Sequence, residues 1–250
     1  MKFSEVRDIV KEIPFISEEN AKILYDTILH QKPSDCLELG FAHGAASCYI
    51  AAALDKLGHG HLTAVDLIEA QEWQKPSIDD LLARCGLGEY VTVVREQTGY
   101  NWFLHDEIVR GSESDLCEPK YDLCVIDGSK NWTIDGLAFL LVDKLLREGG
   151  WILFDDYSWT YAAHDREATD GVTHRKLSEA ERSTPHIREI FHLLVMQHPD
   201  YGNFKLDRYK NWVWAQKIRA NRKEFVIEYR ESYRDLIAKA LFKLRAKWRA

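Results

Sequence analysis

Residues 36–47 read Cys-Leu-Glu-Leu-Gly-Phe-Ala-His-Gly-Ala-Ala-Ser, and this stretch decides the fold. An apolar run ends around an acidic residue, passes through a loop with two glycines, and continues into a run of small residues. That order predicts a strand, a tight turn and a helix N-terminus, the arrangement in which α/β proteins place a nucleotide-like ligand. A carboxylate beside the loop favours a ligand that carries positive charge and hydrogen-bond donors.

The glycines argue against a dinucleotide cofactor. A dinucleotide-binding fingerprint would need glycine at 38, 40 and 43, whereas the chain has Glu38, Gly40 and His43. The Glu38 carboxylate would also stand where a pyrophosphate approaches the loop. A nucleotide-cofactor oxidoreductase on the same architecture is therefore disfavoured, although it remains an alternative.

Strand and helix signals alternate on both sides of this stretch. Apolar and β-branched runs predict strands at 35–39, 61–66, 90–95, 121–126 and 151–154. Between them, helices are expected at 44–57, at a capping box beginning at Ser77, at 101–110 and at 132–147. A closing antiparallel hairpin is expected at 203–208 and 212–216. The predicted fold class is α/β, with a mostly parallel seven-stranded sheet, helices on both faces and a C-terminal antiparallel hairpin.

Three segments are expected along the chain. Residues 1–32 predict an N-terminal helical cap, made of two short helices separated at Pro14. Residues 33–216 form the ligand-binding domain, with a polar lid insertion at 157–183 that has no clear period. Residues 217–250 predict a C-terminal amphipathic helix with apolar residues at three- and four-residue steps. We expect this helix to pack on its own domain, to join two copies in a homo-oligomer, or to bind a membrane surface or an anionic partner.

Composition narrows the class of protein. The chain has 250 residues, 46% of them hydrophobic, and a formal net charge of −7, which argues against a nucleic-acid binder. From residue 217 onward there are 11 Lys or Arg against 4 Asp or Glu, so the tail carries +7 and the remainder −14. Five cysteines without a Cys-x-x-Cys pair indicate reduced thiols and a cytoplasmic location. No apolar run is long enough for a membrane span, and no signal peptide is visible.

Acidic residues end four of the five predicted parallel strands, at Glu38, Asp66, Asp127 and Asp155. In open α/β sheets the ligand lies beyond these carboxyl ends, so we expect the four side chains to meet at one crevice. Asp66 is suited to accept hydrogen bonds from two ribose hydroxyls, because a carboxylate offers two acceptor oxygens. Trp102 or Tyr100 is a candidate to flank an adenine ring.

Asp127, Asp155 and Asp156 follow two strands that should be neighbours in the sheet. Three uncompensated carboxylates repel one another, so they need a cation, raised pKa values or divergent orientations. Hard oxygen donors without nearby His or Cys suit Mg²⁺, Mn²⁺ or Ca²⁺. The alternative is that one aspartate caps a helix, another faces solvent and no metal binds. Lys130 lies three residues past Asp127, within reach of a substrate oxygen.

Together these motifs resemble those of the class I S-adenosylmethionine (SAM) methyltransferases. The resemblance is to the cation-dependent, catechol-type O-methyltransferases and their sugar and natural-product relatives. It rests on Leu-Glu-Leu-Gly-x-x-x-Gly at 37–44, Asp-x-x-Lys at 127–130 and Gly-Gly-x-x-x-x-Asp-Asp at 149–156. The resemblance implies a Rossmann-like fold, Mg²⁺ held by Asp127, Asp155 and Asp156, and catalytic roles for Asp127 and for Lys130 as general base. It also implies a SAM site at Glu38, Gly40, Phe41, Gly44, Asp66 and Asp127.

Two departures bear on the substrate. Asp156 stands where the catechol type usually has asparagine, and the insertion at 157–183 is absent from the compact catechol enzymes. Both fit the sugar and natural-product relatives better. The insertion should shape the acceptor pocket through its aromatic and imidazole side chains, Tyr157, Trp159, Tyr161, His164 and His174.

The expected function is Mg²⁺-assisted transfer of a methyl group from SAM to a hydroxyl of a small sugar, phenolic or natural-product acceptor. One alternative is a metal-independent SAM methyltransferase acting on nitrogen or another atom. Another is a non-catalytic protein that binds a partner on a Rossmann-like scaffold.

Overall fold

The computed structural model describes residues 1–113, 116–164, 168–170, 172–220, 237–238 and 240–241. The chain divides into two units, Met1–Ala220 and Asn221–Ala250. Most of the amphipathic helix predicted at 217–250 lies outside the described residues, although 237–238 and 240–241 are helical. Within the described part of the chain, no helix combines the length and apolarity needed to cross a membrane.

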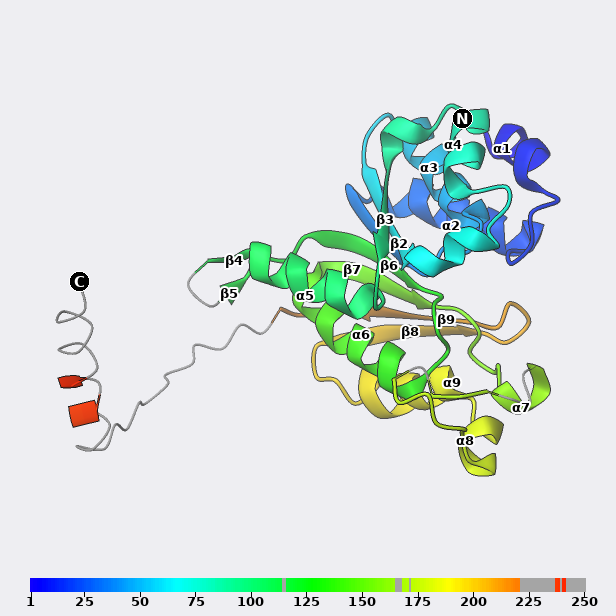
Figure 1. Ribbon diagram of the computed structural model, residues 1–250. Coiled ribbons are helices and arrows are strands. Elements are labelled where there is room, and N and C mark those ends of the chain that lie inside the picture. The colour runs from blue at the N-terminus through cyan, green and yellow to red at the C-terminus, as the bar shows by residue number, and fades with distance from the viewer. Residues whose placement is uncertain (114–115, 165–167, 171, 221–236, 239, 242–250) are drawn as a thin grey trace. The chain divides into compact units, whose positions relative to one another are not determined.

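A seven-stranded sheet organises the first unit, in the order β3-β2-β1-β6-β7-β9-β8 (Figure 1). The five parallel strands are β1 (Asp35–Leu39), β2 (His61–Leu67), β3 (Val91–Glu96), β6 (Tyr121–Ile126) and β7 (Leu146–Phe154). Two antiparallel strands, β8 (Tyr201–Asp207) and β9 (Trp212–Lys217), form the closing hairpin. The predicted fold class is confirmed.

Helices cover both faces of this sheet, because successive strand residues point to opposite sides. On one face, Cys36 packs with α1 (Phe3–Val10), α2 (Glu18–Gln31), α3 (Ala45–Leu57) and α4 (Ile78–Cys85). On the other, Leu37 packs with α5 (Tyr100–Arg110), α6 (Trp132–Leu145), α9 (His186–Ile190) and the π-helical turn η3 (Phe191–Val195). Two apolar cores therefore hold the sheet rigid between them.

Local signals set most helix boundaries where they were predicted. The Ser17 hydroxyl accepts a hydrogen bond from the Asn20 N–H at 3.1 Å and begins α2. Ser77 and Asp80 form the predicted capping box of α4. Gly58 ends α3 in the left-handed conformation that glycine favours, with φ at +75°.

The structure corrects three boundaries. β7 begins at Leu146 instead of 151, and α6 ends at Leu145 instead of 147. The Gly149–Gly150 pair that suggested a turn lies in a bulge of β7, where the strand partners shift from Leu146 to Trp151. The segment 111–119, predicted as a polar connection, contains short strands β4 (Ser112–Glu113) and β5 (Leu116–Cys117).

The insertion at 157–183 has more regular structure than its sequence indicated. It contains α7 (Tyr161–His164), α8 (Glu179–Ser183) and an isolated antiparallel bridge between Thr169 and Lys176. Two short 3₁₀ turns, η1 (Ile68–Glu72) and η2 (Gly88–Tyr90), complete the described elements of the first unit.

Candidate active site

A cavity of about 910 Å³ lies beyond the carboxyl ends of the parallel strands. Each of these strands, or the loop that follows it, contributes lining residues, among them Gly40, Asp66, Thr98, Asp127 and Asp155. The strand pairing continues to the rim, since the Gly40 N–H donates to the Val65 carbonyl at 2.8 Å and the Asp127 N–H donates to Leu39 at 2.9 Å. We call this space the main cavity.

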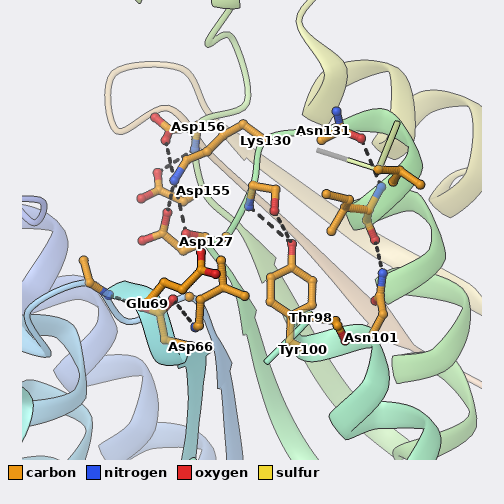
Figure 2. Close-up of a pocket in the computed structure, with 18 of the residues that line it drawn as sticks. Asp66, Glu69, Thr98, Tyr100, Asn101, Asp127, Lys130, Asn131, Asp155 and Asp156 are labelled. Carbon is orange, nitrogen blue, oxygen red and sulfur yellow. Dashed lines mark hydrogen bonds and ion pairs between the residues drawn. The ribbon is translucent and has the colours of Figure 1, made fainter. Parts of the chain in front are cut away.

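Asp127, Asp155 and Asp156 converge at one end of the main cavity, as the sequence predicted (Figure 2). One carboxylate oxygen from each residue lies within 4.8 Å of the others. Burial is the main cause that raises the pKa of Asp127 to about 6, and the negative charge of Asp156 adds to it. Burial, followed by the charges of Asp127 and Asp156, raises the pKa of Asp155 to about 8. Full ionisation of all three carboxyls is therefore unfavourable here unless a cation offsets their charge.

The Lys130 ammonium points into this group of carboxylates (Figure 2). Its Nζ donates to Asp127 Oδ1 at 3.0 Å and to the Asp127 carbonyl at 3.1 Å, and lies 3.4 Å from Asp156 Oδ2. Burial works against the charge on this ammonium, but the attraction of Asp127 and Asp156 outweighs it and raises the pKa of Lys130. Lys130 is thus a protonated amine in this arrangement.

Unusual backbone conformations concentrate around the main cavity. Among the residues that the structure describes, eight non-glycine residues have a positive φ, and five of them line this space. The five are Phe15, Ala42, Lys130, Asp156 and His174. A left-handed conformation costs a non-glycine residue roughly 1–2 kcal/mol, and such strain persists where the surrounding structure enforces it.

Gly40 and Gly44 are required by the packing of the chain itself. Gly40 has φ at +85°, and a Cβ there would lie 2.6 Å from the Cα of Gly128. Gly44 has φ at +90°, and a Cβ there would lie 2.5 Å from the Ile78 side chain. Of the two, Gly40 lines the main cavity and Gly44 does not.

Glu38 and Phe41 lie outside the set of cavity-lining residues. The Ser47 hydroxyl donates a short hydrogen bond to the Glu38 carboxylate, and burial raises the pKa of Glu38 to about 8. The Phe41 ring is buried and lies 4.4 Å from the Arg95 guanidinium carbon. Their contribution to cofactor binding, like that of Gly44, remains a prediction.

Asp66 lines the main cavity, but its carboxylate already serves the surrounding loops. Oδ2 accepts hydrogen bonds from the N–H groups of Phe41 and Ala42 and from the side chain of Gln74, at 3.0–3.3 Å. Oδ1 accepts from the Leu67 N–H at 2.7 Å. Of the two carboxylate oxygens predicted to accept hydrogen bonds from the ribose hydroxyls, Oδ2 is therefore already largely occupied by donors of the protein. Glu69, which sequence reasoning missed, also lines this part of the cavity (Figure 2).

The two candidates for flanking an adenine ring differ in position. Trp102 does not line the main cavity; it is 54% exposed and stacks on His105 with ring centroids 4.5 Å apart, so that candidate was wrong. Tyr100 does line the cavity, and its ring packs so closely on Gly128 that a Cβ there would lie 2.3 Å away. Glycine at 128 is the sequence signal that could have revealed this contact.

Only part of the insertion reaches the main cavity. Tyr161 and His174 line it as predicted, and the Tyr161 hydroxyl donates to the Ser129 carbonyl at 3.0 Å. Tyr157, Trp159 and His164 do not line it, contrary to the prediction. Tyr157 instead hydrogen bonds His192 at 2.8 Å, and the Trp159 and His164 rings stack on each other at 5.1 Å.

Two aromatic residues at the main cavity were not predicted. Phe15, from the segment between α1 and α2, lies parallel to the His43 ring at 5.9 Å. Trp73, just after η1, meets the same His43 ring edge-on at 5.4 Å. Their sequence neighbourhoods carry no motif, because the contact arises from segments far apart in the chain.

Comparison with known proteins identifies the domain. Residues 37–157 match a family model described as a methyltransferase domain. These residues form a methyltransferase domain. A comparison with curated proteins found no match. The family model confirms the expected methyltransferase for the domain that carries the cavity.

Solved structures share the fold at low sequence identity. The O-methyltransferase TomG from Streptomyces achromogenes, solved with SAM, is 17% identical over 86% of this chain and 88% of its own, with a TM-score of 0.57. An O-methyltransferase from Bacillus cereus, solved with S-adenosylhomocysteine (SAH), is 16% identical over 87% and 92%, with a TM-score of 0.58. The SAH-bound Podospora anserina methyltransferase PaMTH1 is 15% identical over 86% of each chain, also at 0.58. At these identities the similarity establishes the fold alone.

Proposed function

We propose that this protein transfers a methyl group from SAM to a hydroxyl oxygen of a small molecule with two neighbouring oxygens. We further propose that Asp127, Asp155 and Asp156 hold a divalent cation, of which Mg²⁺ is the first choice. The observation that carries the proposal is the convergence of three carboxylates within 4.8 Å beside the Lys130 ammonium.

The charge of the main cavity fits SAM. Its lining contains five carboxylates and a single side-chain ammonium, that of Lys130. SAM carries an ammonium and a sulfonium, so a negative cavity favours it, whereas a pyrophosphate would be repelled. A volume of about 910 Å³ lies within the range of small-molecule sites, with room for more than one small ligand. Asp66 Oδ1 and the Glu69 carboxylate would accept the ribose hydroxyls.

The donor set also fits a hard divalent cation. All three side chains offer oxygen, the ligand atom that Mg²⁺, Mn²⁺ and Ca²⁺ prefer. Such a cation would polarise an acceptor hydroxyl and favour a substrate that presents two adjacent oxygens. Asp127 would serve both sites, as a ligand of the cation and as a group beside the cofactor.

We assign the transfer of the acceptor proton to Lys130. Its Nζ reaches the same carboxylates that would orient the hydroxyl, within 3.4 Å. Because those carboxylates raise the pKa of Lys130, the amine accepts a proton only when their attraction is offset. Proton transfer thus depends on how the charge of the three aspartates is balanced.

A metal-independent methyltransferase is favoured by one specific contact. The Lys130 ammonium already pairs with Asp127 and approaches Asp156, so two of the three carboxylates have a partner without a cation. In that case the aspartates would position Lys130, and an acceptor with a more nucleophilic atom, such as nitrogen, would suffice.

A cation titration distinguishes the two. Mg²⁺ or Mn²⁺ should raise the melting temperature of the wild type by mass action, following RT ln(1 + [L]/Kd). Asp155→Asn should abolish that shift and methyl transfer to catechol while leaving calorimetric SAM binding mostly intact. Asp106→Asn, at a partly exposed carboxylate on α5 outside the cavity lining, is the matched control and should behave as the wild type. Full activity in excess EDTA would establish the metal-independent enzyme instead.

A further inference from the structure

A second cavity of about 710 Å³ lies between the insertion, α8 included, and the helices α6 and α9. Asn131 borders both this second cavity and the main cavity. The residue before it, Lys130, lines only the main cavity, and the residue after it, Trp132, lines only the second. The two spaces therefore share Asn131, next in the chain to the amine that would handle the acceptor proton.

The wall between the two cavities is a narrow loop of the insertion, closed by the bridge between Thr169 and Lys176. Val172 and His174 line the main cavity, whereas Thr173 and Arg175 line the second. Hydrogen bonds within the loop fix this alternation: the Asp170 N–H donates to the Arg175 carbonyl at 2.8 Å, and the Asp170 carboxylate accepts from the Thr173 N–H at 2.8 Å.

Helices α7 and α8 of the insertion are also tied to the segment that carries Lys130. Tyr161 of α7 donates to the Ser129 carbonyl at 3.0 Å. The Trp132 N–H donates to His186 Nδ1 at 3.0 Å, and His186 Nε2 lies 2.8 Å from the Glu181 carbonyl of α8. His186 is therefore neutral with its proton on Nε2, and it fixes the floor of the second cavity to the start of α6.

Five charged residues line the second cavity: Asp170, Arg175, Lys176, Glu181 and Glu189. Lys176 already has an interaction within the protein. Glu181 accepts two hydrogen bonds from Ser178, and Glu189 lies 3.3 Å from the Arg188 guanidinium. Asp170 is held by Thr173, as above. Arg175, by contrast, has no side-chain partner within the described part of the chain.

The apolar surface beside Arg175 suits a ring. The indole of Trp132 is 40% exposed and the Leu193 side chain 54% exposed, and both line this cavity. Thr133 and Thr184 line it as well and carry hydroxyls. A flat aromatic face next to hydroxyls and a guanidinium suits a hydroxylated ring that bears a carboxylate, because the guanidinium pairs with a carboxylate in two-pronged geometry.

We propose that the second cavity binds the far end of the methyl acceptor, and that this end is a hydroxylated ring with a carboxylate. The inference rests on the proposed function, since it extends the acceptor from the Lys130 side into the second cavity. It assigns specificity to Arg175 and Trp132, neither of which lines the main cavity. The insertion thus serves acceptor selection from both of its faces.

Three probes test the inference. Catechol has two adjacent hydroxyls alone, quinic acid is a hydroxylated ring with a carboxylate, and 3-caffeoylquinic acid joins the two chemistries. Calorimetry with SAH and Mg²⁺ present should show that wild-type protein binds 3-caffeoylquinic acid at least tenfold more tightly than catechol. Arg175→Gln should remove most of that gain and most quinic acid binding, while catechol binding stays the same. In turnover, Arg175→Gln should raise KM for the long probe and leave kcat unchanged.

Arg208→Gln is the matched control, because Arg208 is exposed between β8 and β9 and lines neither cavity. Equal effects of Arg175→Gln and Arg208→Gln, or equal loss of both catechol and 3-caffeoylquinic acid, would overturn the inference. Trp132→Ala is a second test variant, and it should weaken the binding of 3-caffeoylquinic acid alone. Absence of SAM binding or of methyl transfer to any probe by wild-type protein would count against the proposed function, whereas quinic acid binding that depends on Arg175 tests the second cavity by itself.

Discussion

The phenol of Tyr100 donates a hydrogen bond to the fully buried carboxylate of Asp135, in the helix that follows the turn carrying Lys130. The same Tyr100 oxygen accepts from the Ser129 N–H at 3.3 Å, and Asp135 accepts from the Asn131 N–H at 2.7 Å. Ser129 and Asn131, the neighbours of Lys130 in the chain, are thus held by hydrogen bonds to Tyr100 and Asp135. This pair lets the backbone of Lys130 keep its left-handed conformation, with φ at +53°.

Tyr100→Phe should loosen this turn. Asp135 would lose a donor in a buried position, which lowers the free energy of unfolding by about 1–3 kcal/mol. We expect kcat to fall with little change in SAM affinity, because Lys130 loses its position while the cofactor groups stay. Thermal melting, calorimetry and turnover measure the three effects. Tyr209→Phe, at a fully exposed tyrosine, is the control, and a Tyr100→Phe protein that matched it would refute the positioning role.

Lys130→Gln should separate proton transfer from cation binding. Glutamine keeps much of the side chain's volume but removes the amine, so turnover should fall by ~10²–10⁴ if Lys130 is the general base. The rise in melting temperature with Mg²⁺ should persist, because Asp127, Asp155 and Asp156 are untouched. Partial recovery of turnover at high pH would support the proton-transfer role. Unchanged turnover at neutral pH would assign the proton to another group.

The stability of cation-free protein should fall as pH rises. Asp127 and Asp155 have pKa values raised to about 6 and about 8, against 3.8 for an ordinary aspartate. Between pH 4 and 8 the folded protein binds more protons at these groups than the unfolded chain, so their stabilising contribution is present at low pH and lost through this window. Asp155→Asn should make the free energy of unfolding depend less steeply on pH than in the wild type. Glu38 also has a raised pKa, but it is present in both proteins, so its contribution cancels in the comparison. Urea titrations across this pH range measure it, and identical slopes would contradict the prediction.

The main effect of Gly40→Ala should be a loss of fold stability and not a loss of ligand binding. The new Cβ would stand 2.6 Å from the Gly128 Cα, so the backbones of two loops would have to separate. Gly86→Ala is the matched comparison, because Gly86 also has a positive φ, +66°, but open space around its Cα. We expect roughly 1–2 kcal/mol of destabilisation at Gly86 and a further ~1–3 kcal/mol at Gly40. Equal melting temperatures for the two variants would show that the loops can adjust.

Asp66 and Glu69 should respond differently to loss of charge. Asp66→Ala should lower both SAM affinity, by ~1.5–3 kcal/mol, and the melting temperature, because four donors of the protein lose their acceptor. Glu69→Gln should weaken SAM binding and leave the melting temperature unchanged, since Glu69 is exposed. Calorimetry and thermal melting separate the two. A Glu69→Gln variant with wild-type SAM affinity would assign the ribose to Asp66 alone.

The sequence predicted the part of the site that parallel-sheet geometry dictates. Asp127 and Asp155 end neighbouring strands, so their meeting followed from the strand positions alone. The course of β7 did not, because its bulge at 147–150 depends on pairing with Tyr121 and Leu123. A pair of glycines is compatible with both a turn and a bulge, so the local sequence did not distinguish the two.

Contacts between distant segments could not be predicted from local patterns. Phe15 reaches the main cavity from the N-terminal segment, and no periodicity marks that position. The error at Trp102 has a related cause: a helix was predicted, but not the direction in which each of its side chains points. Asp66 was placed correctly, yet the number of its backbone donors depends on the loop conformation.

The five left-handed residues around the main cavity have a consequence for protein engineering. Glycine adopts such a conformation without steric penalty, so Lys130→Gly or Asp156→Gly would relieve local strain that the native side chains maintain. A selection for heat resistance alone would therefore find ready gains at residues that line the catalytic space. Screening such a library for methyl transfer and melting temperature together would keep the side chains that give the enzyme its chemistry.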